Sequence, residues 1–69
     1  MSEITLRVSA TWHLTIEVGD RVHCGQKMNE GPEMDESSRA PVSGLVKSVQ
    51  FDPGPHEFVI VIAPARAMR

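Results

Sequence analysis

The stretch FVIVI, residues 58–62, is a continuous apolar run made mostly of β-branched side chains. Valine and isoleucine fit a pleated strand, and a run without polar alternation is typical of a strand whose two faces are both covered. The same run on an open edge would favour aggregation, so the fold has to bury it. We therefore expect a buried strand at 58–62, with the rest of the domain arranged around it.

Other stretches show the alternation of apolar and polar residues that is typical of half-buried strands. This alternation occurs in 4–8 and again in 14–18, where it ends at a Gly-Asp turn pair. A short strand is expected at Val22 and a longer one at 45–51. No segment keeps helical spacing over three turns, and the only helical element that we expect is a turn within 29–39. Short strands separated by Gly and Pro corners predict an all-β sandwich or barrel.

The chain is 69 residues long, which is room for a single domain, residues 1–69. We expect its strand core at about 4–62 and a flexible tail at 63–69. Hydrophobic residues make up 41% of the sequence, which is too many for a disordered linker. So short a chain nevertheless builds only a thin core, and this is compatible with a homodimer.

The charge and the apolar pattern exclude several classes of partner. The formal net charge is −2 and the basic residues form no dense run, which argues against nucleic acid. No stretch approaches the ~20 apolar residues of a membrane-spanning helix, and the N-terminus lacks the pattern of a secretory signal. Cys24 is the only cysteine, so no internal disulfide can form, as is typical of a reducing compartment. We expect a cytoplasmic protein that contacts no membrane.

Two segments of the chain also resemble each other. Aligning residues 9–19 with residues 44–54 places a small residue, an apolar-x-apolar strand and a glycine turn at matching positions. Any two β-strands align to some degree, so chance similarity is the alternative. Two related half-motifs in one short chain nevertheless favour a β fold with a pseudo-twofold axis.

Two motifs resemble the biotinyl and lipoyl domain family. VGDRVHCGQKM at 18–28 is similar to the V-x-x-G-D-x-V-x-x-G-Q-x-L segment of that family, and APVSGLV at 40–46 is similar to its A-P-x-x-G-x-V segment. The two come in the family's order with a hairpin-sized insert between them, and the resemblance covers about 9–62. It implies the barrel-sandwich hybrid, which is two small antiparallel sheets related by a pseudo-twofold axis. The residues that carry the motifs are Gly19, Asp20, Gly25, Gln26, Ala40, Pro41 and Gly44.

The resemblance also implies a carrier lysine on the hairpin between the two motifs, because biotin or lipoate is attached through an amide to an ε-amine. Counting forward from the Gly-Gln pair leads to Asp35, and counting back from the Ala-Pro pair leads to Glu33. The counts differ because this hairpin is shorter than the biotinyl one. Both end on a carboxylate, which cannot accept the prosthetic acid, so we expect no cofactor and no carrier function.

A shortened and unmodified hairpin is also similar to the module found in electron-transport subunits of the Rnf and sodium-pumping quinone-reductase kind. Their iron–sulfur and flavin-binding parts have no counterpart in this sequence, so the resemblance implies no redox activity. The alternative is a swinging-arm carrier of a carboxylase or acyl-transfer complex, with biotin or lipoate on a displaced lysine, Lys27 or Lys47. Solvated strand lysines are the simpler interpretation of both.

We therefore expect a non-catalytic binding or structural module that contacts a protein partner through residues 29–39, hereafter the acidic hairpin. Four carboxylates lie where a carrier would present its lysine, and they would suit a basic partner. A solvated loop is the plainer interpretation of the same charges. The candidate contact residues are Glu30, Glu33, Met34, Asp35 and Glu36.

No catalytic or metal-binding pattern emerges from the remaining residues, and we expect neither an enzyme nor a metal site. His23 and Cys24 are adjacent, so in a strand they point to opposite faces and cannot readily share an ion or a proton. A metal or redox accessory role for these two with His13 and His56 is a third hypothesis. Trp12 could mark a partner-binding patch, but covering the open end of a thin core is the simpler role.

Overall fold

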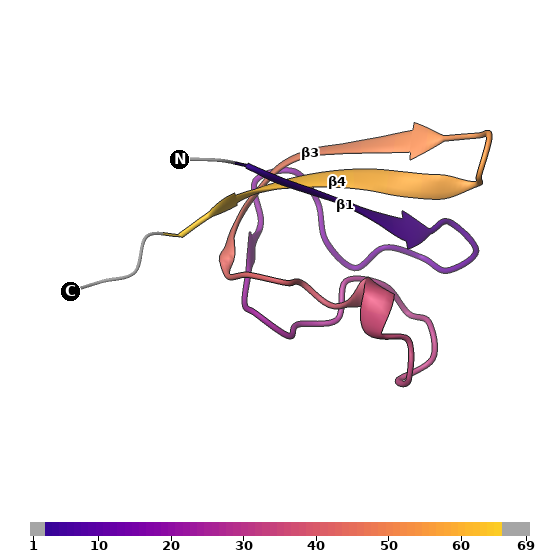
Figure 1. The fold of residues 1–69 in the computed structure, drawn as a ribbon, viewed down its shortest axis with the longest axis horizontal. Coiled ribbons are helices and arrows are strands. Elements are labelled where there is room, and N and C mark those ends of the chain that lie inside the picture. The colour runs from indigo at the N-terminus through magenta and orange to yellow at the C-terminus, as the bar shows by residue number, and fades with distance from the viewer. Residues whose placement is uncertain (1–2, 66–69) are drawn as a thin grey trace.

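The apolar run near the end of the chain lies inside β4 (Glu57–Pro64), which is an internal strand of one antiparallel sheet. The computed structural model describes residues 3–65, and its sheet has the order β1-β4-β3-β2 (Figure 1). β1 (Ile4–Ser9) and β3 (Gly44–Asp52) pair with the two edges of β4, and β2 (Arg21–Val22) pairs with the start of β3. The chain is thus a small all-β domain, as its strand patterns predicted.

β4 buries only one of its two faces. Ile60 and Ile62 are fully buried in the core, whereas Val59 and Val61 on the other face are half-buried. The prediction that both faces of this strand are covered is therefore wrong. On this outer face Arg7 lies opposite Val59, in the ladder between β1 and β4.

A small cluster of charges crosses this outer face. The Nη1 atom of Arg7 donates to Asp52 Oδ2 at 3.0 Å and lies 3.4 Å from Glu57 Oε1, so one side chain joins β1 to β3 and β4. The hydrogen bond to Asp52 is the main reason why the pKa of Arg7 is raised. Solvent screens all three exposed groups, so the cluster aligns the strands and contributes little to stability.

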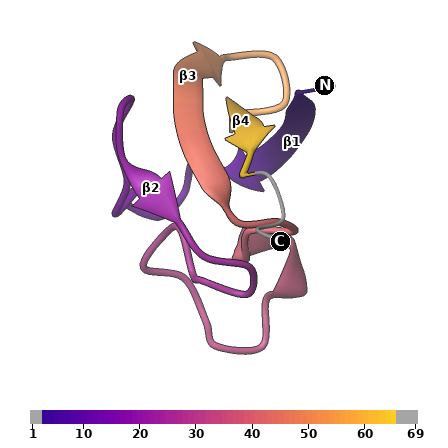
Figure 2. The same cartoon turned by 90° about the vertical axis from the view of Figure 1, so that its left-hand side faces the viewer.

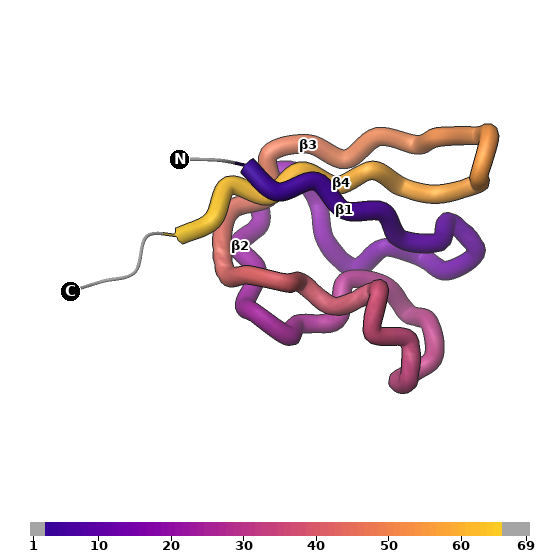
Figure 3. The backbone as a smooth tube through the Cα atoms, in the orientation of Figure 1, coloured from indigo at the N-terminus to yellow at the C-terminus, as the bar shows by residue number. Residues whose placement is uncertain are grey.

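The two small sheets that the family resemblance implied are not both present. There is one sheet, and residues 10–43 wrap beneath it as an irregular layer (Figure 3). Among the described residues of that layer, the only pairing outside β2 consists of the isolated bridges Leu14–Asn29 and Lys27–Arg39. The physical reason is that Gly, Pro and turn-forming residues interrupt this part of the chain before a ladder can extend.

The strand predicted at 14–18 is likewise absent. Its alternating pattern correctly predicted which residue is buried at one position, but not at another. Ile16 is buried, but Val18 is 60% exposed because it lies in the turn before β2. The proposed repeat is therefore not reflected in matching structures, because 44–54 contains a nine-residue strand and 9–19 is mostly loop. A strand needs a partner at hydrogen-bonding distance, and the local pattern of side chains does not supply one.

Gly44 forms the corner at which β3 begins and the sheet curls towards β2 (Figure 2). An ideal Cβ added to this residue would lie 2.2 Å from the carbonyl oxygen of Ala63 and 2.9 Å from Cγ2 of Ile62. Gly44 therefore permits a close approach of two backbone segments that any side chain would block. A bulge between Val46 and Ser48 follows directly and bends the strand further.

The core is a single apolar cluster between the sheet and the irregular layer. Met28 comes from the irregular layer, is fully buried, and packs in the same cluster as the isoleucines of β4. It thus occupies the interior position at which the family motif has leucine. The buried members of the cluster are Val8, Ile16, Val22, Met28, Ala40, Val46, Ile60 and Ile62.

The described chain contains one short helical element, the 3-10 turn η1 (Glu36–Ser38), which lies in the acidic hairpin as predicted. Within residues 3–65 there is no helix of the length and apolarity that crossing a membrane requires. β4 continues through Ala63 and Pro64, beyond the expected end of the strand core. Ala65 N–H donates a hydrogen bond to Ser43 O at 2.8 Å, and residues 66–69 of the expected flexible tail lie outside the described residues.

Candidate functional site

The acidic hairpin, residues 29–39, projects from the irregular layer on the side away from β3 (Figure 1). Its two arms are joined below the tip by backbone hydrogen bonds. Met28 N–H donates to Ser38 O, and Ala40 N–H donates to Gln26 O, each at 2.8 Å. Ser38 is completely buried at the inner end of η1. The base of the hairpin is therefore held firmly, and its outer residues are presented from a fixed platform.

Trp12 packs against the first corner of this hairpin. An ideal Cβ on Gly31 would lie 2.9 Å from Cδ1 of Trp12, so the indole ring rests directly on the glycine. The side chain of Asn29 is buried beside this corner, and its Oδ1 accepts a hydrogen bond from Gly31 N–H at 3.0 Å. Its Nδ2 atom has no hydrogen-bond partner in the described structure. Trp12 is 40% exposed and is not one of the residues that pack against the core cluster within residues 3–65. It therefore covers the corner of the hairpin, and not the open end of the core as expected.

The four carboxylates of the hairpin do not form a single uniform surface. Asp35 caps η1, because its Oδ1 accepts from the N–H of Ser37 at 3.1 Å and also from the Ser37 hydroxyl. The side chain of Glu33 is 86% exposed and lies 3.1 Å from Arg39 Nη2. Glu36 is exposed without a side-chain hydrogen bond inside the described chain.

Met34 occupies the turn at the tip, between Glu33 and Asp35, and is 87% exposed. The turn is closed by a hydrogen bond from Asp35 N–H to Pro32 O at 3.1 Å. Glu30 is exposed nearer the base, where its N–H donates to His13 O. The tip thus presents one flexible apolar side chain with carboxylates around it.

Arg39 is a structural residue of the acidic hairpin that the sequence reasoning missed. Its guanidinium donates a hydrogen bond to Gly25 O at 2.9 Å. It also donates to two oxygens of Glu33, the backbone carbonyl oxygen and the carboxylate Oε1. One side chain therefore ties the tip to the first motif. The only signal in the sequence was that Arg39 is the single basic residue in an otherwise acidic stretch.

The first motif residues close turns, as their sequence predicted. Gly19 has a φ of +96°, and Asp20 Oδ2 accepts from Glu17 N–H at 2.9 Å across the same turn. In the following turn, Gly25 has a φ of +87° and Gln26 Oε1 accepts a hydrogen bond from His23 N–H, three residues earlier, at 2.9 Å. These roles shape the fold and supply no reactive group.

The residues of the second motif lie in the core and at the corner where β3 begins. Ala40 is buried, and its N–H and C=O both pair with the other arm of the hairpin. Pro41 is exposed, and its carbonyl accepts a weak hydrogen bond from the thiol of Cys24 at 3.4 Å. Cys24 is a free, exposed cysteine.

Neither lysine considered as a displaced carrier lies at the hairpin tip. Lys27 is half-buried in the bridge with Arg39 at the base of the hairpin. Lys47 is exposed at the bulge of β3, on a different side of the domain. At the two positions to which the resemblance would assign a carrier lysine, Asp35 caps η1 and Glu33 forms an ion pair with Arg39.

The histidines and the cysteine are not brought together. Among residues 3–65, no group of three His, Cys, Asp or Glu side chains has the proximity needed to hold a metal ion. His56 instead packs edge-on against Phe51 with 5.5 Å between ring centroids, and His13 and His23 are exposed.

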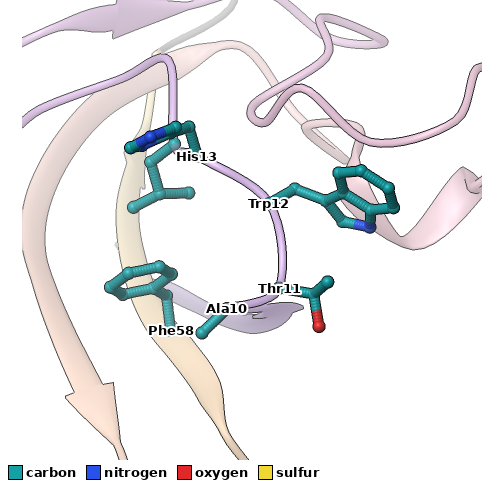
Figure 4. A pocket seen from close by; sticks show the side chains of 6 residues that line it. Ala10, Thr11, Trp12, His13 and Phe58 are labelled. Atoms are coloured by element: carbon teal, nitrogen blue, oxygen red, sulfur yellow. The ribbon is translucent and has the colours of Figure 1, made fainter.

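A shallow hollow of about 270 Å³ lies beside the start of the irregular layer (Figure 4). The backbone of residues 10–14 forms one wall, and the ring of Phe58 forms the other. Figure 4 shows that the ring of Trp12 points away from Phe58. His13 is the only titratable side chain in the lining of this hollow.

Comparisons of the chain with protein-family models, with curated proteins and with solved structures found no match. The class that the fold itself defines is a small all-β domain built on one curled antiparallel sheet.

Proposed function

We propose that this chain is a non-catalytic binding module of the biotinyl/lipoyl-like kind that lacks the modifiable lysine and contacts a basic protein partner through the acidic hairpin. The observation that carries the proposal is the tip, where Met34 is 87% exposed between acidic neighbours. A flexible thioether adapts to an irregular apolar pocket, and carboxylates around it favour a partner with Lys or Arg at the rim.

The kinship with the carrier family is part of this proposal and is supported by how the hairpin arms pair. Hydrogen bonds alternate between 25–28 and 38–40, and two more join 13–15 to 28–30. These three short segments supply the backbone pairing of the irregular layer outside β2. We interpret the irregular layer as a reduced form of the family's second sheet, which retains the hairpin and has lost regular strands.

The carboxylates of the acidic hairpin differ in their contacts, and these differences decide which residues to change in a test. Asp35 caps η1 and should be kept, because its loss would alter the hairpin itself. The double variant Met34→Ser with Glu36→Lys removes the apolar anchor and reverses a charge without touching a described hydrogen bond. We expect this variant to fold normally. In affinity capture followed by quantitative mass spectrometry, it should capture less than a tenth of the amount of partner that the wild type captures.

Glu17→Lys provides a matched control, because Glu17 is an exposed acid outside the hairpin whose side chain has no hydrogen bond in the described structure. The control should retain the same partners as the wild type. If the hairpin variant and the control capture identical partners in equal amounts, docking through the tip is wrong.

The proposal also predicts that no prosthetic group is attached. After co-expression with biotin and lipoyl ligases, the intact mass should equal that of the unmodified chain, because the hairpin has no lysine. A known carrier domain expressed in parallel would verify that both ligases are active. A mass increment localised to Lys27 or Lys47 would instead establish the carrier function.

A further inference from the structure

One edge of the sheet is left open along β3. β2 pairs only with Gly44 and Leu45, and the turn before it pairs with Val46, whose N–H donates to Asp20 O at 2.9 Å. From residue 47 to residue 52, β3 pairs with β4 alone within the described structure, and nothing lies above this edge in Figure 1. Such a row of free backbone donors and acceptors can pair with another strand.

The open edge carries apolar side chains on the inner face of the sheet. Phe51 is 50% exposed there, although it packs edge-on against Phe58 with 5.8 Å between ring centroids. Val49 lies on the same face and is half-buried against the core. A strand added at this edge would extend the inner face and cover part of both side chains.

The charges at the two ends of the edge determine which strand fits best. Lys47 lies at its beginning and Asp52 at its end. In an antiparallel pair of two copies, Lys47 of each copy approaches Asp52 of the other, so the favourable contact occurs twice. A parallel pair would bring like charges together. The bulge between Val46 and Ser48 opposes a shift of the pairing past Lys47.

We propose that two copies of this chain pair through these β3 edges around a twofold axis at Gln50, which joins two four-stranded sheets into one. Residues that face each other across the axis then belong to the same side of the sheet, and Val49 of one copy lies opposite Phe51 of the other. The contact is small, so the dimer is weak, with a Kd of about 10–100 μM. This surface is separate from the acidic hairpin and does not depend on the docking proposed for it.

Sedimentation equilibrium over a wide concentration range tests the pairing. The wild type should fit a monomer–dimer equilibrium, and a purely monomeric chain at about 1 mM would overturn the proposal, given the expected Kd. Lys47→Glu and Asp52→Lys should each weaken self-association at least tenfold, because each places like charges together twice. An equimolar mixture of the two variants restores both opposite-charge contacts and should dimerise like the wild type.

Lys27→Glu changes the net charge by the same amount away from the edge and should leave self-association unchanged. Loss of the dimer in this control, or no recovery in the mixture, would overturn the proposed edge. Asp52→Lys also removes the contacts of Asp52 with Arg7 and with Gly54 N–H, so its fold must be verified by circular dichroism. If it does not fold, amide exchange of the wild type decides, since protection at 48–52 should increase with concentration and constant exchange there would contradict the pairing.

Discussion

Replacing Gly44 with alanine should remove most of the protein's stability. The new Cβ would lie 2.2 Å from the carbonyl oxygen of Ala63 and 2.9 Å from its carbonyl carbon. These are backbone atoms of β4, so relief requires the two strands to separate at the corner. We expect a loss of about 3 kcal/mol or more in the free energy of unfolding. A core of this size supplies only about 3–5 kcal/mol in total.

Gly54→Ala is the matched control, because the nearest atom to its new Cβ would be Asp52 Oδ1 at an ordinary 3.5 Å. This glycine has no positive φ, so alanine should be tolerated within about 0.5 kcal/mol. Urea unfolding followed by circular dichroism compares the two variants directly. If Gly44→Ala were as stable as Gly54→Ala, the close approach of β3 to β4 would not be a constraint on the fold.

Met28→Ala should destabilise the domain by about 3 kcal/mol, because it removes a large side chain that is 0% exposed. Met28 packs in the same cluster as Ile60 and Ile62, so it joins the irregular layer to the sheet. The cavity should therefore loosen the acidic hairpin before it unfolds β4. Urea unfolding measures the global effect, and amide exchange at 29–39 would measure the local one.

Met34→Ala removes the same side chain from a position that is 87% exposed and serves as the control. Its free energy of unfolding should stay within about 0.5 kcal/mol of the wild type. Equal losses in the two variants would show that Met28 does not hold the layers together. A decrease in partner capture by Met34→Ala without a loss of stability would in turn support docking through the tip.

The loop at 29–39 was predicted from the sequence, whereas several of the contacts that shape it were not. The acidic hairpin is where the motifs placed it, and Met34 and Glu36 are free to contact a partner. The cap formed by Asp35 and the clamp formed by Arg39 were not predicted. Both depend on where the chain turns back on itself, and residue spacing does not determine that.

The sequence by itself determined the all-β class, the strands at the two ends of the described chain and the turns at Gly19 and Gly25. These features follow from consecutive residues, because side-chain alternation and permitted values of φ are local properties. The tertiary structure alone decided that 14–18 is not a strand and that one sheet forms in place of two. Both outcomes depend on hydrogen-bond partners that are distant in sequence. A partner on both edges makes β4 (Glu57–Pro64) an internal strand, and a missing partner leaves the edge of β3 open.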